Sequence, residues 1–266
     1  MSAPVVISSP HNPLAQGWKA LTRSRKARME TRTFLAEGEH MAEEALRSGL
    51  VTALLCAEDA QERYQALIAE AQERELPVYL LSARVLEAVT DTKTPQGILA
   101  LCRMPDTGSL SDLPLIAALE NVQDPGNVGT VLRTMDAIGN AGVLLSRECA
   151  DVFAPKTLRA TMGAVFRVPV WIAEDLRAAL EALKKRDYRL MAGALDGTPF
   201  YERPADAEHT CLLIGNEGQG LTPETAALAQ QKVRLPMPGQ AESLNAAVAC
   251  AVMAYDVLRR RLEHEG

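Results

Sequence analysis

Short apolar runs of strand length alternate with longer amphipathic segments along most of this chain of 266 residues. In the C-terminal half, residues 115–119 and 211–214 have the composition of buried strands, and residues 128–138 have helical spacing. Such alternation favours a mostly parallel sheet with helices on both faces, because each parallel connection needs a crossover. The sequence therefore predicts an α/β fold.

The same alternation runs through residues 33–102, where it predicts a smaller α/β unit. Residues 104–114 contain two prolines and one glycine among small polar residues, which is typical of a linker. Two domains also suit the length, at ~100–200 residues per domain. We therefore expect an N-terminal domain over residues 1–103, a linker over 104–113 and a C-terminal domain over 114–266.

Charge is distributed unevenly along the chain. The whole sequence has a net charge of −6, and apolar residues make up 47% of it, which argues against disorder and against a wholly basic nucleic-acid coat. Residues 1–33 have instead a local net charge of +5, from six basic residues and Glu30. Such an arm either contacts a polyanion or forms a solvated helix face, and charge alone leaves both open. The basic residues are Lys19, Arg23, Arg25, Lys26, Arg28 and Arg32.

Several classes of protein are disfavoured by what the sequence lacks. The start has no basic stretch followed by an apolar core, and the longest apolar run, residues 246–255, is too short for a membrane span of ~20 residues. The five cysteines are odd in number and form no CxxC pair, and the four histidines are scattered. We therefore expect a cytoplasmic protein with buried cysteines, no metal and no membrane partner.

The first candidate functional segment spans residues 119–133. An apolar run leads into Asp124-Pro125-Gly126, and Asn127 is predicted to cap the helix that follows. Arg133 lies six residues further on, and a long side chain on a helix points back toward the helix start. Both side chains could meet one ligand there, but for this segment taken alone an ordinary cap and a surface arginine are the simpler explanation.

The second segment is a glycine-rich stretch after the apolar run 211–214. Gly215, Gly218 and Gly220 follow the spacing GxxGxG, which permits close backbone approach and exposes N–H groups. This spacing differs from both the dinucleotide GxGxxG order and the GxxxxGK[ST] phosphate loop, and Glu217 disfavours phosphate cradling. Taken alone, the stretch is a generic glycine-rich turn.

The third segment spans residues 233–249. Pro236, Pro238 and Gly239 predict a rigid loop, and Ser243 is predicted to start a helix of small residues that can pack closely against a neighbour. A capped core helix is the simpler explanation for the residues from Ser243 onward, but it does not account for the proline- and glycine-containing loop before them.

Together the three segments resemble the three motifs of the SpoU (TrmH-type) RNA 2′-O-ribose methyltransferases of the SPOUT superfamily, in order and spacing, over residues 114–260. The preceding region resembles the family's substrate-binding domain, at residues 32–38 and 94–97. The resemblance implies a C-terminal SPOUT domain whose parallel sheet contains a deep trefoil knot, plus a smaller N-terminal α/β domain. It also implies S-adenosylmethionine bound at the knot, and a homodimer.

The resemblance assigns roles residue by residue. The catalytic roles would fall on Asn127, Arg133, Glu217, Ser243 and Asn245. The cofactor pocket would involve Gly193, Ile214, Gly215, Leu235, Met237, Ser243 and Leu244. Contact with RNA would come from the basic arm and the motif arginine, namely Arg23, Arg25, Lys26, Arg28 and Arg133.

The reaction that the resemblance implies is attack of a ribose 2′-hydroxyl on the methyl group of S-adenosylmethionine, which leaves S-adenosylhomocysteine. A ribose hydroxyl needs proton removal and in-line positioning to react at neutral pH. In the family, the motif arginine is the suggested base. Because free arginine has a pKa above about 12, binding of a phosphate or of the developing alkoxide by Arg133 is an equally tenable role.

The two-domain layout favours 23S ribosomal RNA as the substrate. The alternatives are a transfer-RNA 2′-O-methyltransferase, an antibiotic-resistance methylase acting on ribosomal RNA, and a non-catalytic RNA-binding module of the same fold. A nucleotide- or flavin-binding α/β protein is disfavoured, because both phosphate-binding glycine patterns are missing.

Overall fold

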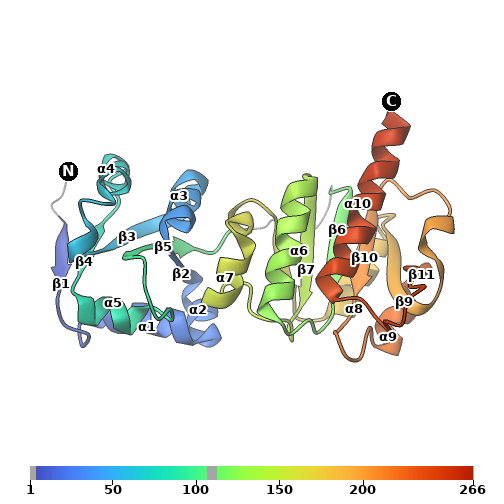
Figure 1. Cartoon of the computed structure of the whole chain (residues 1–266), viewed down its shortest axis with the longest axis horizontal. Coiled ribbons are helices and arrows are strands. Elements are labelled where there is room, and N and C mark those ends of the chain that lie inside the picture. The colour runs from blue at the N-terminus through green and yellow to red at the C-terminus, as the bar shows by residue number, and fades with distance from the viewer. Residues whose placement is uncertain (1–3, 107–112, 266) are drawn as a thin grey trace. The chain divides into compact units, whose positions relative to one another are not determined.

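The computed structural model describes residues 4–106 and 113–265, and the chain forms two compact units (Figure 1). The first unit comprises Met1–Asp106 together with Asp151–Arg167, and the second comprises Thr107–Ala150 together with Val168–Gly266. The centre of the expected linker, residues 107–112, lies outside the described residues. One segment, residues 151–167, thus packs with the N-terminal unit although it lies within the expected C-terminal domain.

The first unit is built on a five-stranded sheet in the order β1-β4-β3-β5-β2. Strands β1, β4 and β3 run parallel, and β5 runs antiparallel to both β3 and β2. The strands are β1 (Val5–Ile7), β2 (Thr33–Glu37), β3 (Val51–Ala57), β4 (Val78–Leu81) and β5 (Ile98–Arg103). The helices before residue 107 are α1 (Pro13–Arg23), α2 (Arg25–Thr31), α3 (Glu39–Ser48), η1 (Glu58–Ala60), α4 (Gln65–Glu73) and α5 (Ala83–Val89).

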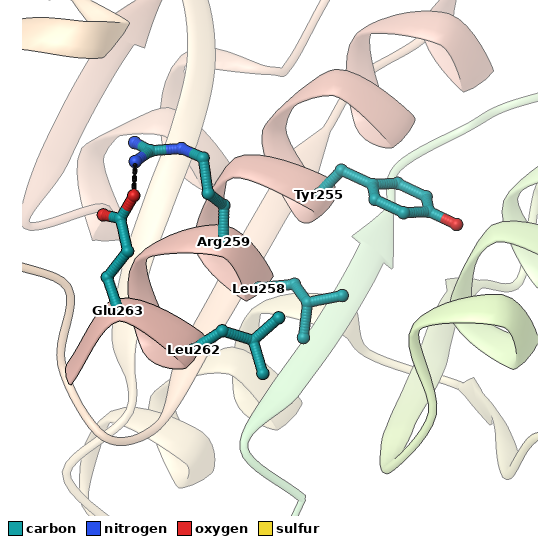
Figure 2. A pocket seen from close by; sticks show the side chains of 5 residues that line it. All are labelled: Tyr255, Leu258, Arg259, Leu262 and Glu263. Carbon is teal, nitrogen blue, oxygen red and sulfur yellow. Dashed lines mark hydrogen bonds and ion pairs between the residues drawn. The ribbon is translucent and has the colours of Figure 1, made fainter. Parts of the chain in front are cut away.

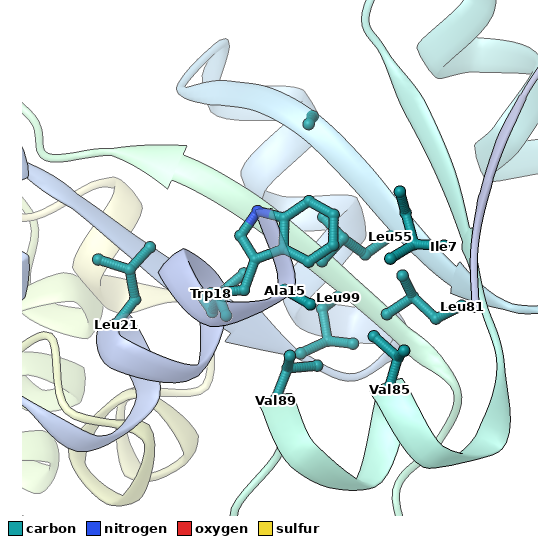
Figure 3. Packing of buried hydrophobic residues seen from close by; sticks show 11 residues of the cluster. Ile7, Ala15, Trp18, Leu21, Leu55, Leu81, Val85, Val89 and Leu99 are labelled. Carbon is teal, nitrogen blue, oxygen red and sulfur yellow. The ribbon is translucent and has the colours of Figure 1, made fainter. Parts of the chain in front are cut away.

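Helices α1 and α5 cover one face of this sheet. Trp18 of α1 is 3% exposed and packs in a cluster with Leu55 of β3 and Leu99 of β5, as Figure 3 shows. Val85 and Val89 of α5 join the cluster from one face of that helix, because they are four residues apart. The basic N-terminal arm is therefore two ordered helices whose apolar side belongs to the core.

The segment 151–167 completes the core of this unit. It contains α7 (Pro155–Thr161) and the short helix η2 (Ala164–Phe166). Phe34 of β2 is fully buried, with the ring of Phe153 at 4.9 Å and the ring of Phe166 at 6.0 Å between centroids. Both rings come from this segment, so the edge strand β2 depends on it for its packing.

Ion pairs hold the same segment in place. Arg28 Nη2 lies 2.6 Å from Asp151 Oδ2, with the two side chains only 5% and 8% exposed. The Arg28 guanidinium also donates to the carbonyl oxygen of Leu21, at the end of α1. Two more pairs join the segment to the unit, Arg159 with Asp91 and Arg167 with Glu44.

The second unit has a six-stranded sheet in the order β11-β9-β10-β6-β7-β8, with every adjacent pair parallel. The strands are β6 (Leu115–Leu119), β7 (Ala141–Ser146), β8 (Val170–Ala173), β9 (Arg189–Pro199), β10 (Thr210–Ile214) and β11 (Gln231–Arg234). The helices are α6 (Pro125–Ile138), α8 (Leu176–Lys184), η3 (Phe200–Glu202), α9 (Pro223–Leu228) and α10 (Ala246–Glu265).

Helices cover both faces of this sheet, which confirms the predicted α/β architecture. Helices α6 and α10 pack against each other, α6 on β7 and α10 on β10 (Figure 1). On the opposite face, Ile116 and Ala118 of β6 pack with Leu180 of α8. Alternate residues of β6 thus point to opposite faces, and all five are buried.

Most predicted elements are present, with shifted ends. The strand expected over residues 211–214 begins one residue earlier, at Thr210. Helix α6 begins at Pro125 instead of Val128, because proline suits the first turn of a helix, where the N–H that it lacks has no partner in the helix.

Candidate active site

The site lies at the point in the parallel sheet where the chain adds strands in opposite directions from two neighbouring strands. Strands β6 and β10 are neighbours, but the chain leaves β6 toward β7 on one side and leaves β10 toward β11 on the other. At such a switch point the loops after the two strands diverge and leave a crevice at their carboxyl ends. The loops here are residues 120–124 and the stretch 215–221, which we call the glycine-rich loop.

Asp124, not Asn127, caps helix α6. The Asp124 side chain accepts a hydrogen bond from the backbone N–H of Asn127 at 3.0 Å, and Pro125 is the first helical residue. The predicted cap at Asn127 is therefore wrong by three residues. Because Asn127 lies in the first turn, its side chain is free to reach across to other segments.

The Asn127 amide joins the three motif segments. Its Nδ2 donates to Glu217 Oε1 of the glycine-rich loop at 2.7 Å. Its Oδ1 accepts a hydrogen bond from Asn245 Nδ2 at 2.9 Å. Asn127 thus bonds residues that lie 90 and 118 positions away in sequence. We call the resulting chain of side chains, Asn245–Asn127–Glu217, the amide relay.

Asn245 also caps helix α10. Its Oδ1 accepts from the backbone N–H groups of Ala247 and Val248, at 3.0 and 3.2 Å. The helix therefore begins at Ala246 and not at Ser243, which is exposed two residues before the cap. Serine and asparagine are both good caps, so the sequence could not separate these two starts.

Gly215 has no room for a side chain. A Cβ atom there would lie 2.1 Å from the backbone carbon of Gly220, because the glycine-rich loop folds back over its own start. Asn216 and Gly220 exchange both backbone hydrogen bonds, at 3.0 and 2.9 Å. The first glycine of the predicted motif is thus required because the backbone of Gly220 occupies the space that a side chain at position 215 would need.

The residues expected to bind the cofactor lie at the ends of three adjacent strands and in the loop before α10. Gly193 follows the part of β9 that pairs with β10, Ile214 ends β10 and Leu235 follows β11. The side chains of Leu235 and Met237 are half-buried, and Leu244 is 40% exposed beside the exposed Ser243. Accessible apolar side chains next to loop backbone fit an adenosine group, which needs flat apolar contacts and backbone hydrogen bonds.

Two predicted catalytic residues, Arg133 and Ser243, lie outside the amide relay. The arginine is the one with a charged side chain. It is exposed on α6 and makes no hydrogen bond or ion pair with the residues that the structure describes. Among the described residues, Asn127 and Glu217 make no polar contact with Arg133, because these two side chains bond each other. All five N–H donors of Arg133 are therefore available to a bound molecule.

The basic residues of the N-terminal unit divide into two groups. Arg23 is exposed at the end of α1, and Lys26 is exposed and lies 3.7 Å from Glu30. Arg25 is half-buried at the start of α2. The prediction that Arg28 contacts RNA needs correction, because its guanidinium is buried against Asp151 and cannot reach a phosphate.

The cysteines are all buried and serve the core, as predicted. Burial raises the pKa of the Cys56 thiol to about 11 and that of Cys250 to about 12. Cys149 donates from its Sγ to the carbonyl of Leu119 at 3.2 Å. Burial raises the pKa of this thiol as well, although several hydrogen bonds oppose the shift. Thiols in this state are poor nucleophiles.

Over the two described stretches of chain, no group of three or more His, Cys, Asp or Glu residues is arranged to hold a metal ion. No helix in those stretches is both long and apolar enough to cross a bilayer.

Sequence reasoning missed a second set of site residues. Glu120, Asn121, Ser146, Asn216 and Thr222 hold the two loops together through side-chain hydrogen bonds. Ser146 ends β7, Glu120 and Asn121 follow β6, and Asn216 and Thr222 lie in the connection between β10 and α9, so all five are at the carboxyl edge of the sheet. That position, which ligands favour in open parallel sheets, was the signal that could have found them.

A parallel sheet with a polar relay and an apolar edge at its switch point defines an α/β enzyme that binds a nucleoside-like ligand. Family models agree: residues 114–255 match the SpoU rRNA Methylase family, and residues 12–100 match the MRM3-like substrate binding domain. The chain belongs to the SpoU rRNA methylase family. It is an S-adenosylmethionine-dependent RNA methyltransferase with a SPOUT fold, as the sequence motifs indicated.

The chain resembles characterised relatives over nearly its full length. It is 39% identical to the 23S rRNA (guanosine(2553)-2′-O)-methyltransferase RlmP of Bacillus subtilis, across 94% of this chain and 97% of that protein. The AdoMet-bound rRNA methyltransferase of Sinorhizobium meliloti superposes with a TM-score of 0.84 at 31% identity, covering 97% of this chain and 98% of that one. The methyltransferase AviRb of Streptomyces viridochromogenes, in complex with AdoMet, gives 0.83 at 26% identity, covering 95% and 99%.

Proposed function

We propose that this protein methylates a ribose 2′-hydroxyl in 23S ribosomal RNA. The observation that carries the proposal is the amide relay, in which Asn127 joins Glu217 and Asn245 beside the cofactor edge. The similarity to the Bacillus enzyme over both domains supports the same substrate class and makes its guanosine 2553 the first nucleotide to examine.

S-adenosylmethionine supplies an electrophilic methyl group on a sulfonium. The chain's own residues then have two tasks, which are to hold the donor and to orient the ribose. Ile214, Leu235 and Met237 provide apolar contacts for the adenosine, and Ser243 and Leu244 close the edge before α10. The relay fixes the glycine-rich loop against α6, so that donor and hydroxyl are held in line, the arrangement that lowers the barrier most.

Arg133 acts on the RNA. Its guanidinium has no internal partner in the described part of the chain, so it can pair with the phosphate next to the target or with the alkoxide oxygen as the proton leaves. In this electrostatic role the guanidinium keeps its proton and its positive charge, whereas a general base would have to lose the proton first. We favour it over the role of general base, because nothing buries the Arg133 side chain.

The N-terminal unit binds the RNA away from the reacting ribose. Arg23 and Lys26 are exposed, and Arg25 lies between them in sequence at the α1–α2 junction. Lysine and arginine side chains on such a surface neutralise phosphates and make binding dependent on salt. Arg28 instead stabilises the unit through Asp151.

Methyl transfer to separated RNA fractions tests the proposal. Purified protein is incubated with tritiated S-adenosylmethionine and with 23S, 16S or transfer RNA, free and within ribosomal subunits. We expect label in 23S RNA and one site resistant to alkaline cleavage, with the guanosine named above examined first. Label in transfer RNA alone would contradict the substrate, and bound cofactor without any transfer would favour a non-catalytic RNA-binding role.

A second copy of this chain is proposed to cover helix α10. Val248, Tyr255 and Leu262 are 48, 50 and 60% exposed, and their spacing of seven residues puts them on one face of the helix. Tyr255, Leu258 and Leu262 line a groove of about 440 Å³, and Figure 2 shows Leu258 and Leu262 pointing to the same side. Arg259 is paired with Asp256 and Glu263, so this surface is largely apolar.

Sedimentation tests the homodimer. We expect wild-type protein to sediment as a dimer and Leu262→Glu to shift it toward the monomer, because a charge would be buried in an apolar interface. Glu208→Gln, an exposed change on a loop, serves as the control. A monomeric wild type at micromolar concentration would contradict the proposal.

The trefoil knot and the cytoplasmic location stay predictions.

A further inference from the structure

Two residues directly after β6 bond both ends of the glycine-rich loop. The backbone N–H of Glu120 donates to the carbonyl of Ile214 at 2.9 Å, which extends the β6–β10 pairing by one bond. Asn121 follows with a φ of 55°, a left-handed conformation that asparagine tolerates. The Glu120 side chain reaches the end of the loop, and the backbone carbonyl of Asn121 meets its beginning.

Glu120 holds the far end of the loop. Its Oε2 accepts from the backbone N–H of Thr222 at 2.7 Å. Its Oε1 accepts from the hydroxyl groups of Thr222 and Thr225, at 2.9 and 2.5 Å. Glu120 is 7% exposed and Thr225 is 1% exposed, so these bonds are shielded from water. The carboxylate thus fixes the first turn of α9, directly after the loop.

Asn121 holds the near end. Its carbonyl accepts from Asn216 Nδ2 at 2.8 Å, and Asn216 Oδ1 accepts from the N–H groups of Gly218 and Gln219, at 2.9 and 3.1 Å. Ser146 of β7 supports Asn121 by accepting its N–H at 3.0 Å and donating to its Oδ1 at 3.1 Å. Both ends of the loop are thus anchored to β6 and β7.

We propose that Glu120 is a positioning residue for methyl transfer: it clamps the glycine-rich loop so that Glu217 meets Asn127. Between the two anchored ends, the Glu217 side chain makes the loop's one side-chain hydrogen bond to α6 among the described residues. A loop released at Thr222 would sample positions in which this bond is lost. The inference rests on the proposed function for its effect on rate, but the clamp itself is a property of the free protein.

The test combines hydrogen exchange with kinetics in Glu120→Gln. A carboxamide keeps the shape but turns an N–H₂ group toward one of the three donors, which removes at least one charge-assisted bond. We expect the amides of Gly218 and Gly220 to exchange about tenfold faster and kcat to fall about tenfold, with KM for RNA within about twofold. Exchange in β7 should stay unchanged, which separates a local release from general destabilisation.

Glu224→Gln is the matched control, because Glu224 lies in the same turn of α9 but is exposed. Thr225→Val removes one hydroxyl donor to Glu120 with little change of shape, and Thr225→Ser restores it. We expect the first variant to reproduce part of the Glu120→Gln effect and the second to return to wild-type values. This pair keeps the test valid if Glu120→Gln folds poorly.

Exchange and kcat that match Glu224→Gln would overturn the proposal, and so would faster loop exchange with unchanged kcat. A wild-type protein that methylates no RNA would refute the proposed function instead. In that case the exchange data alone would still decide whether Glu120 clamps the loop.

Discussion

Asn127 Nδ2 lies 2.7 Å from Glu217 Oε1, and this contact fixes the orientation of the Asn127 amide. With the amide reversed, its oxygen would face a carboxylate, and its N–H₂ would face the N–H₂ of Asn245. Only one orientation satisfies both neighbours. The relay is therefore directional, and a change at Asn127 disturbs all three motif segments at once.

Asn127→Ala should abolish the relay with little cost to folding. We expect kcat/KM to fall by about 100-fold or more, because the loop and α6 lose their connection and the reacting groups lose alignment. The free energy of unfolding should change by less than about 1 kcal/mol, since Asn127 is only half-buried. Steady-state transfer and urea unfolding check this, with Thr130→Ala, an exposed change one turn along, as the control. Wild-type kinetics in Asn127→Ala would refute the role of the relay.

Arg133→Ala should remove transfer and leave cofactor binding intact. The guanidinium acts on RNA in our assignment, so we expect kcat/KM to drop by about 10³-fold, comparable with losing a major electrostatic contact. Calorimetric titration with S-adenosylmethionine should give an affinity within about twofold of wild type. Arg177→Ala, at an exposed position of α8, is the control for loss of a positive charge. Near wild-type transfer by Arg133→Ala would show the assignment to be wrong.

Gly215→Ala should disrupt the glycine-rich loop, whereas Gly218→Ala should not. The new Cβ at position 215 would lie 2.1 Å from backbone, but at position 218 the nearest atom is the side-chain oxygen of Asn216 at 3.6 Å. We expect the first variant to lose about 100-fold in kcat/KM and the second to stay within about threefold. Equal kinetics for the two variants would mean that the loop relaxes around the added carbon.

Arg28 should matter for stability more than for RNA affinity. Removing one partner of a buried ion pair costs about 3–5 kcal/mol, so Arg28→Met should lower the free energy of unfolding of the N-terminal unit by that amount. Lys26→Met, on the exposed face, should leave stability within about 0.5 kcal/mol but reduce the salt dependence of RNA binding. Urea unfolding and filter binding at several salt concentrations measure both effects. The reverse pattern would restore Arg28 as an RNA contact.

The Arg203–Asp256 pair should give a stability that depends on pH. Burial alone would raise the pKa of Asp256, but hydrogen bonds from Arg203 and Arg259 outweigh it and leave that pKa lowered. A lowered pKa stabilises the fold above the unfolded value of about 3.9, and the contribution is lost as pH falls through the folded pKa. Wild type should thus lose stability below about pH 4, and Asp256→Asn should lose less over that range. Parallel pH curves for the two proteins would contradict this.

The alternation of apolar runs predicted most strands and helices, because each buried strand carries its own local signal. Residues 115–119 form a strand with the predicted bounds, and residues 211–214 lie in β10. The caps were harder to predict, because Asp124 precedes Asn127, Ser243 precedes Asn245, and all four are of residue types that often cap helices. Which of two neighbours caps a helix depends on packing that the local sequence does not encode.

Long-range pairing lay beyond the sequence patterns. Arg28 is an ordinary basic residue in a basic stretch, and its burial follows from Asp151, which is 123 residues away. Glu120 and Thr222 are likewise partners across 102 residues. The family resemblance brought the three motifs together, which residue spacing alone could not do. It gave no sign that the Asn127 amide would bond Glu217 instead of Arg133.

Residues 151–167 belong to the N-terminal unit, and this affects the order in which the two units can fold during synthesis. Phe153 and Phe166 cover Phe34, and Asp151 pairs with Arg28, so this unit is incomplete until residue 167 is synthesised. Domains usually fold in order as they leave the ribosome. Here the first domain must wait while β6, α6 and β7 emerge, and a chimaera with another family member would have to exchange two separate pieces of the gene.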